Sequence, residues 1–193
     1  KLPSTKVQAF HRADESGTTD NFQKYLMAAA PSDWTFGKGK KFAAPGGQSA
    51  KGSDGVTQAV KATDGAVTYT ELSFAQNASL GVAKLSTGAS SPVELTAASA
   101  GKTIATAKQT GTGNDLALKI DYATKEAGAY PILLVTYEIV CSKNSDATKA
   151  ANIKAFLTHF ASPETQKSLE EIGYAPLPSS VQTKVEAAIE ALS

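Results

Sequence analysis

Cysteine and histidine are the scarcest residues with side-chain chemistry in this sequence. There is 1 cysteine, Cys141, and there are 2 histidines, His11 and His159, far apart in the chain. A single cysteine forms no internal disulfide, and so few sulfur and nitrogen ligands argue against a zinc-type metal site. Because Cys141 ends the apolar run YPILLVTYEIVC, we expect it to be a small buried residue on a strand.

The sequence also lacks an excess of one charge and a long apolar run. Its 19 lysines and arginines stand against 18 aspartates and glutamates, which gives a net charge of +1. No basic stripe or tail appears, and this argues against nucleic acid as a partner. No apolar run has the roughly 20 residues of a membrane-spanning helix. The hydrophobic share of 41% over 193 residues is ordinary for a globular protein with a sizeable core.

Strand-like and helix-like patterns alternate along the chain, which predicts an α/β fold. Strands are expected at 6–12, 65–72, 114–122 and 132–141, and helices at about 19–30, 55–63, 91–108, 147–160, 163–172 and 179–192. The segment 132–141 is almost continuously apolar, which is typical of a strand buried on both faces. The helix at 163–172 has clear boundaries, with Ser162 as N-cap, Pro163 at its first position and Gly173 just past its end.

The most informative stretch is FHRADESGTTDNFQKYL, residues 10–26, where polar residues precede a helix. Unpaired N–H groups at a helix N-terminus attract anions, and Gly17 lets a ligand approach the backbone closely. Ser16 and Thr18 add hydroxyl groups, and the planar guanidinium of Arg12 matches an oxyanion. Asp14 would hold that guanidinium in place. The chemistry fits a grip on a small, multiply charged oxyanion, but it also fits an ordinary helix cap beside a solvated Arg–Asp pair.

A resemblance to a known family bears on that choice. HRADESGTTDNF resembles the Arg-x-Asp-x-Ser-Gly-Thr segment of the phosphate-binding proteins that feed phosphate ABC transporters, the PstS family. KGSDGVTQAVKATDGAVTYTEL is similar to the family's Gly-rich turn, helix and strand, AYPILLVTYEIVC to its return strand, and IGYAPLPSSV to its closing helical region. The resemblance implies that Arg12, Ser16, Gly17 and Thr18 contact phosphate and that Asp14 orients Arg12.

The same resemblance implies a periplasmic-binding-protein-like (type II) fold with two lobes, present here as its C-terminal portion. Residues 1–128 would form the second lobe, which carries the phosphate motif. Residues 129–193 would form a crossover strand and helices that return to the first lobe. The chain also departs from the family, since it has no GSTF-like segment, and Ser53 and Thr68 stand where the family often has Asn and Gly.

The function implied by the resemblance is capture of inorganic phosphate for an ABC importer, without catalysis, metal or cofactor. The expected partners are phosphate, the permease subunits in the membrane and the missing N-terminal half of the protein. The expected location is extracytoplasmic, either periplasmic or lipid-anchored on the outer face of the cell membrane. In the family the other lobe supplies a carboxylate that accepts the proton of hydrogen phosphate. We therefore expect the chain alone to bind phosphate weakly.

Two alternatives stay open at this point. One keeps the fold and changes the ligand to another oxyanion, sulfate or molybdate. The other is a phosphoester hydrolase with Ser16 as nucleophile, which needs a nearby base or metal, and only His11 is adjacent in sequence.

Overall fold

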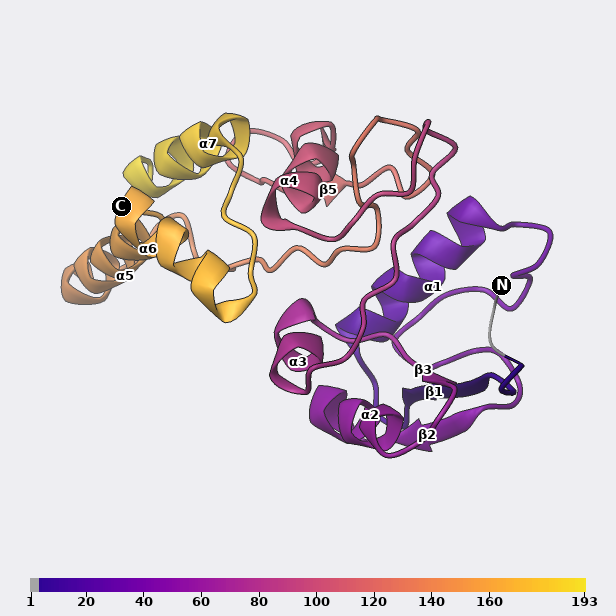
Figure 1. The fold of residues 1–193 in the computed structure, drawn as a ribbon. Helices are drawn as coiled ribbons and strands as arrows, with labels where there is room; N and C mark the ends of the chain where they lie inside the picture. Colours follow the sequence, from indigo (N-terminus) through magenta and orange to yellow (C-terminus); the bar gives the residue numbers. More distant parts are fainter. Residues whose placement is uncertain (1–3) are drawn as a thin grey trace. The chain divides into compact units, whose positions relative to one another are not determined.

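The computed structural model describes residues 4–193 and divides into two compact units (Figure 1). The first unit comprises the chain up to Lys84 together with Pro131–Leu134. The second unit comprises Leu85–Tyr130 and Val135–Ser193.

A parallel sheet is the centre of the first unit. Strands β1 (Gln8–Arg12), β2 (Gln48–Ala50) and β3 (Ala66–Val67) lie in the order β2-β1-β3, so β1 is the central strand. Arg12 pairs with Ala50 at the end of β2, and Ala9 pairs with Val67 at the end of β3. Because all three strands run the same way, the chain leaves each of them at one edge of the sheet.

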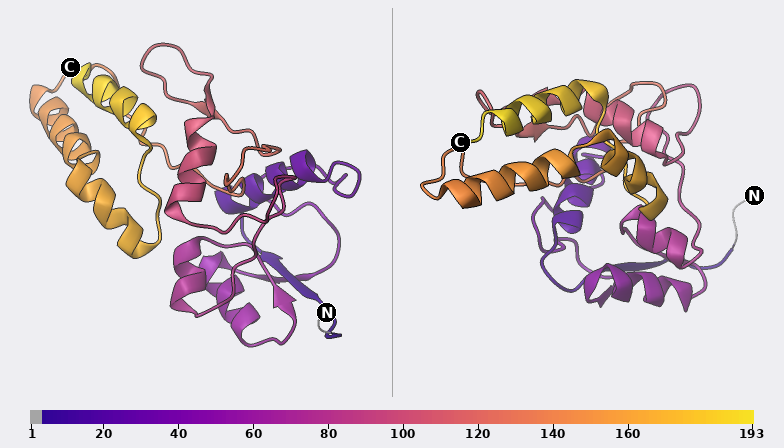
Figure 2. Two further views of the ribbon diagram at one scale, coloured as in Figure 1. Left: turned by 45° about the horizontal axis from the view of Figure 1, so that its top comes forward. Right: turned by 90° about the vertical axis from the view of Figure 1, so that its left-hand side faces the viewer.

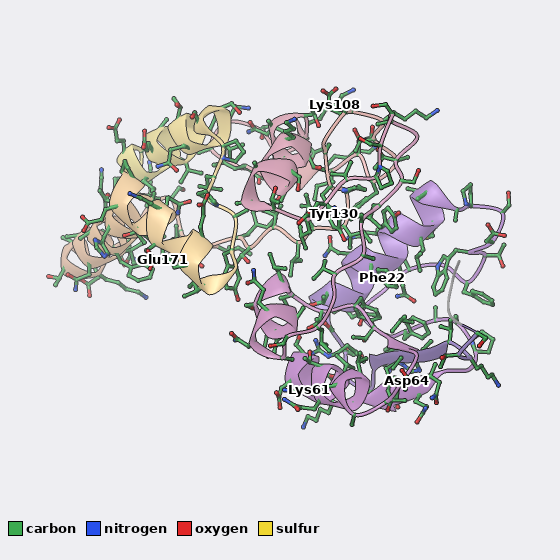
Figure 3. All side chains as sticks on the ribbon, viewed as in Figure 1. Phe22, Lys61, Asp64, Lys108, Tyr130 and Glu171 are labelled. Carbon is green, nitrogen blue, oxygen red and sulfur yellow. The ribbon has the colours of Figure 1, made fainter. Side chains whose placement is uncertain are left out.

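Helices α1 (Gly17–Ala29), α2 (Gly52–Lys61) and α3 (Leu72–Asn77) complete this unit. Helix α2 lies along the sheet (Figure 1) and buries Val56 and Thr57 completely or nearly so. After Lys61 the chain turns at Asp64 (Figure 3), and Gly65 takes a positive φ of 75° that favours glycine. This turn starts β3 beside β1.

Helix α1 is joined to the sheet by aromatic side chains and to a long loop by one amide. Phe22 (Figure 3) stacks on Tyr69 with ring centroids 4.6 Å apart. The Gln23 side chain is fully buried. Its Nε2 donates to the carbonyl oxygens of Gly39 and Lys41 at 2.8 and 3.0 Å, and its Oε1 accepts from the Ala43 N–H at 2.7 Å. The side chain of this one glutamine thus hydrogen-bonds three backbone groups in the loop 39–43 beside α1.

The second unit is mainly helical. Its elements are α4 (Ala97–Ala105), the antiparallel pair β4 (Lys108–Gln109) and β5 (Leu118–Lys119), α5 (Ala147–Phe160), α6 (Pro163–Ser168), the 3-10 turn η1 (Leu169–Ile172) and α7 (Ser179–Glu190). Helices α5 and α7 run side by side in both views of Figure 2, and Leu157, Ala161 and Ile189 form the core between them.

The predicted helices are confirmed except that only Ala97–Ala105 of the predicted helix 91–108 is helical. The Ser162 side chain caps α6 by accepting from the Thr165 N–H, Pro163 occupies the first position, and Gly173 takes the left-handed conformation. Other regions differ in detail. β2 lies inside what the sequence presents as a loop, and α3 begins at Leu72 within the predicted strand 65–72. Of the predicted strand 114–122, only Leu118–Lys119 pairs.

The prediction of a buried strand at 132–141 is wrong for this structure. Within the described residues this segment belongs to no strand, and its later part is exposed, with Ile139 at 93%. Cys141, expected to be buried on that strand, is exposed as well. The physical reason is that an extended segment becomes a strand only when another strand satisfies its backbone N–H and C=O groups. No described strand pairs with this one.

None of the helices within residues 4–193 combines the length and the apolar character needed to cross a membrane.

Candidate functional site

The candidate site lies in the first unit, at the edge where the parallel strands end. The motif Arg12–Thr18 begins with the last residue of β1, Ser53 follows β2, and Glu71 follows β3. In open α/β sheets, ligands bind outside the carboxyl ends of the strands, where loops and helix N-termini meet. Three segments distant in sequence therefore meet at the position typical of a ligand site.

Arg12 and Asp14 form a two-point ion pair. Arg12 Nε donates to Asp14 Oδ1 at 2.9 Å, and Nη2 donates to Oδ2 at 2.6 Å. Asp14 Oδ1 also accepts from the Gly52 N–H at 2.9 Å, which joins the pair to the start of α2. Arg12 Nη1 donates to Ser53 Oγ at 3.0 Å. The Arg12 guanidinium is thus held by both Asp14 and Ser53.

These contacts shift the protonation equilibria of both partners. The hydrogen bonds from Arg12 and from the Gly52 N–H hold the pKa of Asp14 well below its usual range. The hydrogen bond from Arg12 to Asp14 raises the pKa of the guanidinium. Asp14 therefore carries its charge at neutral pH, and both of its oxygens are engaged.

Arg12 has N–H donors that no described residue accepts from. A guanidinium has five N–H groups, of which three are used in contacts with described residues. One N–H on Nη1 and one on Nη2 remain. Because the Arg12 side chain is only 12% exposed, these donors are held in one orientation. They suit two oxygens of one oxyanion.

The predicted residues Ser16, Gly17 and Thr18 form the N-terminus of α1. Ser16 is buried and is the N-cap, with its Oγ accepting from the Thr18 N–H at 3.1 Å. Gly17 is exposed, and a Cβ there would meet only Leu134 Cδ1, at 3.9 Å. Packing therefore does not require glycine at this position, whereas close approach by a ligand would. A helix start of this kind offers partial positive charge to an anion.

Two residues of the site were not among the predicted binding residues. Ser53 touches Arg12, as described above, and was noted only as a departure from the family pattern. Glu71 accepts from Thr18 Oγ1 through Oε1 at 2.8 Å and from Thr70 Oγ1 through Oε2 at 3.3 Å. Ser53 and Glu71 lie far from the motif in the sequence, so nothing in the sequence indicated that they belong to the site. The parallel sheet brings both residues beside the motif.

The charge of Glu71 is retained despite partial burial. Burial raises the pKa of this carboxyl, but hydrogen bonds from the side chains of Ser53, Thr18 and Thr70 and from its own backbone lower it, and the net shift is downward. The site thus holds one cation, Arg12, and two carboxylates, of which Asp14 is fully engaged with Arg12.

Tyr69 ties the motif to the rest of the first unit. Its hydroxyl oxygen accepts from the Arg12 backbone N–H at 3.1 Å and lies 2.7 Å from Thr19 Oγ1. Tyr69 and Thr19 are both buried. The end of β1 and the first turn of α1 are therefore fixed to one aromatic ring.

His11 packs against an aromatic ring of the first unit. Its ring stacks on Phe42 with centroids 4.3 Å apart, and its Nδ1 donates to the Arg12 carbonyl oxygen at 3.1 Å. Within residues 4–193 no contact joins His11 to Ser16, whose oxygen caps α1. Nor does that part of the chain bring together a group of histidine, cysteine and carboxylate side chains that would hold a metal ion.

Comparison with known proteins identifies relatives of this chain. The chain is 44% identical over 195 residues to the phosphate-binding proteins PstS 3 and PstS 2 of Mycobacterium tuberculosis, matching 100% of this chain and 52% of each relative. It is 33% identical to a phosphate-binding protein PstS of Xylella fastidiosa, across 96% of this chain and 50% of the relative. The chain therefore spans about half the length of the curated relatives it matches.

Solved structures show the same fold. A periplasmic phosphate-binding protein bound with phosphate superposes with a TM-score of 0.65 at 24% identity, across 95% of this chain and 57% of that one. A human phosphate binding apolipoprotein gives a TM-score of 0.61 at 22% identity. Residues 1–164 match the family model of the PBP superfamily domain. The predicted α/β, periplasmic-binding-protein-like fold is thus confirmed, and this chain belongs to the PBP superfamily.

Proposed function

We propose that this chain is the phosphate-gripping portion of a solute-binding protein that captures inorganic phosphate for an ABC-type importer. The single observation that carries the proposal is the Arg12–Asp14 pair held beside the N-terminus of α1 at the carboxyl edge of a parallel sheet. The names of the PstS relatives support phosphate as the ligand.

The proposed grip uses donors of three kinds. The two remaining N–H groups of Arg12 take two phosphate oxygens, and the backbone N–H groups at the start of α1 meet the ligand over Gly17. The hydroxyl of Ser16 is the third kind of donor, and Thr18 contacts the ligand from the same helix start. Asp14 does not touch the ligand and keeps the guanidinium in position. Neutral and cationic donors in a fixed arrangement stabilise an oxyanion without a metal.

Other parts of the proposal concern the whole protein. Residues 1–128 belong to the lobe that carries the motif, and residues 129–193 return to the other lobe. The N-terminal half of the protein supplies the rest of that other lobe, and the cleft closes by the hinge motion common to such proteins. The protein works outside the cytoplasmic membrane and hands phosphate to permease subunits. It is a binding protein and not an enzyme, which the names of its PstS relatives support.

Phosphate titration of the wild type and of Arg12→Ala tests this proposal. We expect wild-type binding weaker than micromolar for the chain alone, followed calorimetrically or by the amide resonance of Gly17 in a nitrogen-15 NMR spectrum. Arg12→Ala is expected to weaken binding by about 30-fold, because charge-assisted hydrogen bonds of roughly 1.5–3 kcal/mol are lost. Arg12→Lys should recover only part of the affinity, since an ammonium group does not bind two oxygens in one plane.

Lys61→Ala is the matched control, since it removes one positive charge from the far end of α2 in the same unit. It should leave phosphate affinity unchanged. If Arg12→Ala and Lys61→Ala lost phosphate affinity equally, the loss would be explained by net charge and not by the site. Absence of phosphate binding at tens of millimolar would contradict the proposed function, whereas micromolar or tighter binding would contradict only the need for the N-terminal half.

A further inference from the structure

Three lysines lie close together in the loop after α1, and the proposed grip does not use them. Lys38, Lys40 and Lys41 belong to the stretch FGKGKKF, residues 36–42, and all of them are exposed. The whole chain has a net charge of only +1, so this density of positive charge is a local feature. A run of like charges is usually a solvated surface. The place of this loop in the fold therefore decides whether its charges have a role.

The backbone of this loop is held against the start of α1. The Lys40 carbonyl oxygen accepts from the N–H of Ser16, the N-cap of the helix, at 2.9 Å. The fully buried side chain of Gln23, one turn further along α1, hydrogen-bonds three backbone groups of residues 39–43. The side chain of Lys40 therefore begins beside the proposed phosphate site.

Aromatic side chains hold the two ends of the same loop. Phe42 stacks on His11 of β1 with ring centroids 4.3 Å apart, and on Tyr69 at 6.3 Å. Trp34 meets the Phe42 ring edge-on at 5.7 Å, and its Nε1 donates to the Gly37 carbonyl oxygen at 2.7 Å. The loop is thus held at both ends and in its middle, and its lysines keep their place relative to α1.

The charges within the site do not by themselves attract an anion. Arg12 carries one positive charge, whereas Asp14 and Glu71 carry a negative charge each. A phosphate dianion that approaches the site from solution therefore meets a net negative charge. Positive charge from another segment is needed to offset this repulsion.

Two of the loop lysines have positive charge available for this purpose. Lys41 Nζ lies 3.6 Å from Glu15 Oε1, so its charge is partly balanced. Within residues 4–193, no carboxylate forms an ion pair with Lys38 or Lys40. The Debye length at physiological ionic strength is about 8 Å, so charges on side chains that begin beside the N-cap still act on an approaching ion.

We infer that Lys38 and Lys40 attract phosphate electrostatically and speed its association with the site, without contacting the bound ion. This inference rests on the proposed function and adds the residues that determine the rate of capture. Charges at the rim of a binding surface mainly change the association rate constant and its salt dependence. The dissociation rate constant depends instead on the contacts of the bound ion with Arg12 and the start of α1.

The experiment measures the association and dissociation rate constants of phosphate separately. Relaxation dispersion of the Gly17 amide resonance during a phosphate titration gives both, at mildly alkaline pH where phosphate is a dianion. In Lys38→Gln/Lys40→Gln we expect association to be about threefold slower at an ionic strength of about 0.1 M, with dissociation unchanged. At about 1 M, where the Debye length is about 3 Å, the difference from the wild type should disappear.

Lys6→Gln/Lys61→Gln is the matched control, because it removes the same amount of charge from the same unit. Lys6 precedes β1, and Lys61 ends α2, about 15 Å from the start of that helix. Both lysines thus lie at the edge of the sheet opposite the site, and this variant should keep the wild-type rate constants. Glu15→Gln removes the partner of Lys41 and should make association faster.

The possible results separate this inference from the proposed function. Wild-type rate constants in Lys38→Gln/Lys40→Gln, with phosphate binding still lost in Arg12→Ala, would overturn the inference and leave the proposed function intact. So would an equal slowing in the control variant. Faster dissociation with unchanged association would also overturn it, because the lysines would then contact the bound ion. A wild type that binds no phosphate would overturn both.

Discussion

At the scale of single residues, the site depends on how completely each side chain is engaged. Arg12 uses three donors within the protein and retains two, and Asp14 has no unengaged oxygen. Thr18 has given its hydrogen to Glu71. Residue type alone gives each of these groups several possible roles. The neighbouring residues leave each group one role, because its hydrogen bonds within the protein use particular donors and acceptors.

The Asp14 pair predicts a specific pH dependence of stability. The pKa of Asp14 in the folded protein lies below the unfolded value of about 4, so the folded state binds fewer protons there. The contribution of the pair to the free energy of unfolding is therefore complete above that value and is lost as the pH falls below it. We expect Asp14→Asn to be less stable than the wild type near neutral pH, with the difference shrinking at acid pH.

Denaturant unfolding of the two proteins between pH of about 7 and about 3 measures this difference. Asp33→Asn, a change at an exposed loop position, is the control and should follow the wild-type curve. Parallel curves for the wild type and Asp14→Asn would show that the ion pair adds nothing in the folded state.

At the scale of elements, the start of α1 serves the fold and the ligand together. The Ser16 cap satisfies one backbone N–H group, and the Gln23 amide holds the loop that lies over the helix. Ser16 N–H also donates to the Lys40 carbonyl oxygen of that loop at 2.9 Å. Substitutions at this helix start are therefore expected to change both stability and phosphate binding. A substitution at the N-cap of another helix shows the effect on stability alone.

Ser16→Ala and Ser162→Ala make that comparison. Both serines cap a helix by accepting a backbone hydrogen bond, Ser16 on α1 and Ser162 on α6. Each substitution is expected to lower the free energy of unfolding by about 1 kcal/mol. Only Ser16→Ala should also weaken phosphate binding, by about tenfold in a calorimetric titration, because its hydroxyl lies in the proposed grip. Equal phosphate affinities for the two variants would remove Ser16 from the grip.

At the scale of the whole molecule, all of the proposed ligand contacts belong to the first unit. The second unit has its own core around Leu157, Ala161 and Ile189. A ligand stabilises whatever it binds in the folded state, by about 1.4 kcal/mol at ten times its Kd. The second unit therefore serves as an internal reference when the stabilisation of the first unit by a ligand is measured.

Hydrogen exchange with and without phosphate tests where the stabilisation falls. We expect slower exchange in β1, in the first turns of α1 and α2 and at the start of α3. Exchange in α5 and α7 should change little. Arg12→Ala with phosphate is the control and should resemble the ligand-free protein. Slowing of equal size in α5 and α7 would contradict a site confined to the first unit.

The sequence by itself determined most of the helices and the motif, because these depend on neighbours along the chain. Ser162, Pro163 and Gly173 mark the ends of their helix through backbone effects that act within a few residues. The motif Arg12–Thr18 occupies seven consecutive positions, and its strand-to-helix context follows from local periodicity. The family resemblance, carried by ordered motifs along the chain, also came from the sequence.

Only the tertiary structure decided which distant residues join the motif and which apolar run pairs as a strand. Ser53 and Glu71 reach Arg12 and Thr18 because β2 and β3 lie on either side of β1, and no local pattern encodes that adjacency. The segment 132–141 has the composition of a buried strand but no described partner strand, and Cys141 is exposed with it. Strand formation requires hydrogen bonds from a second segment, so composition sets the propensity and the partner decides the outcome.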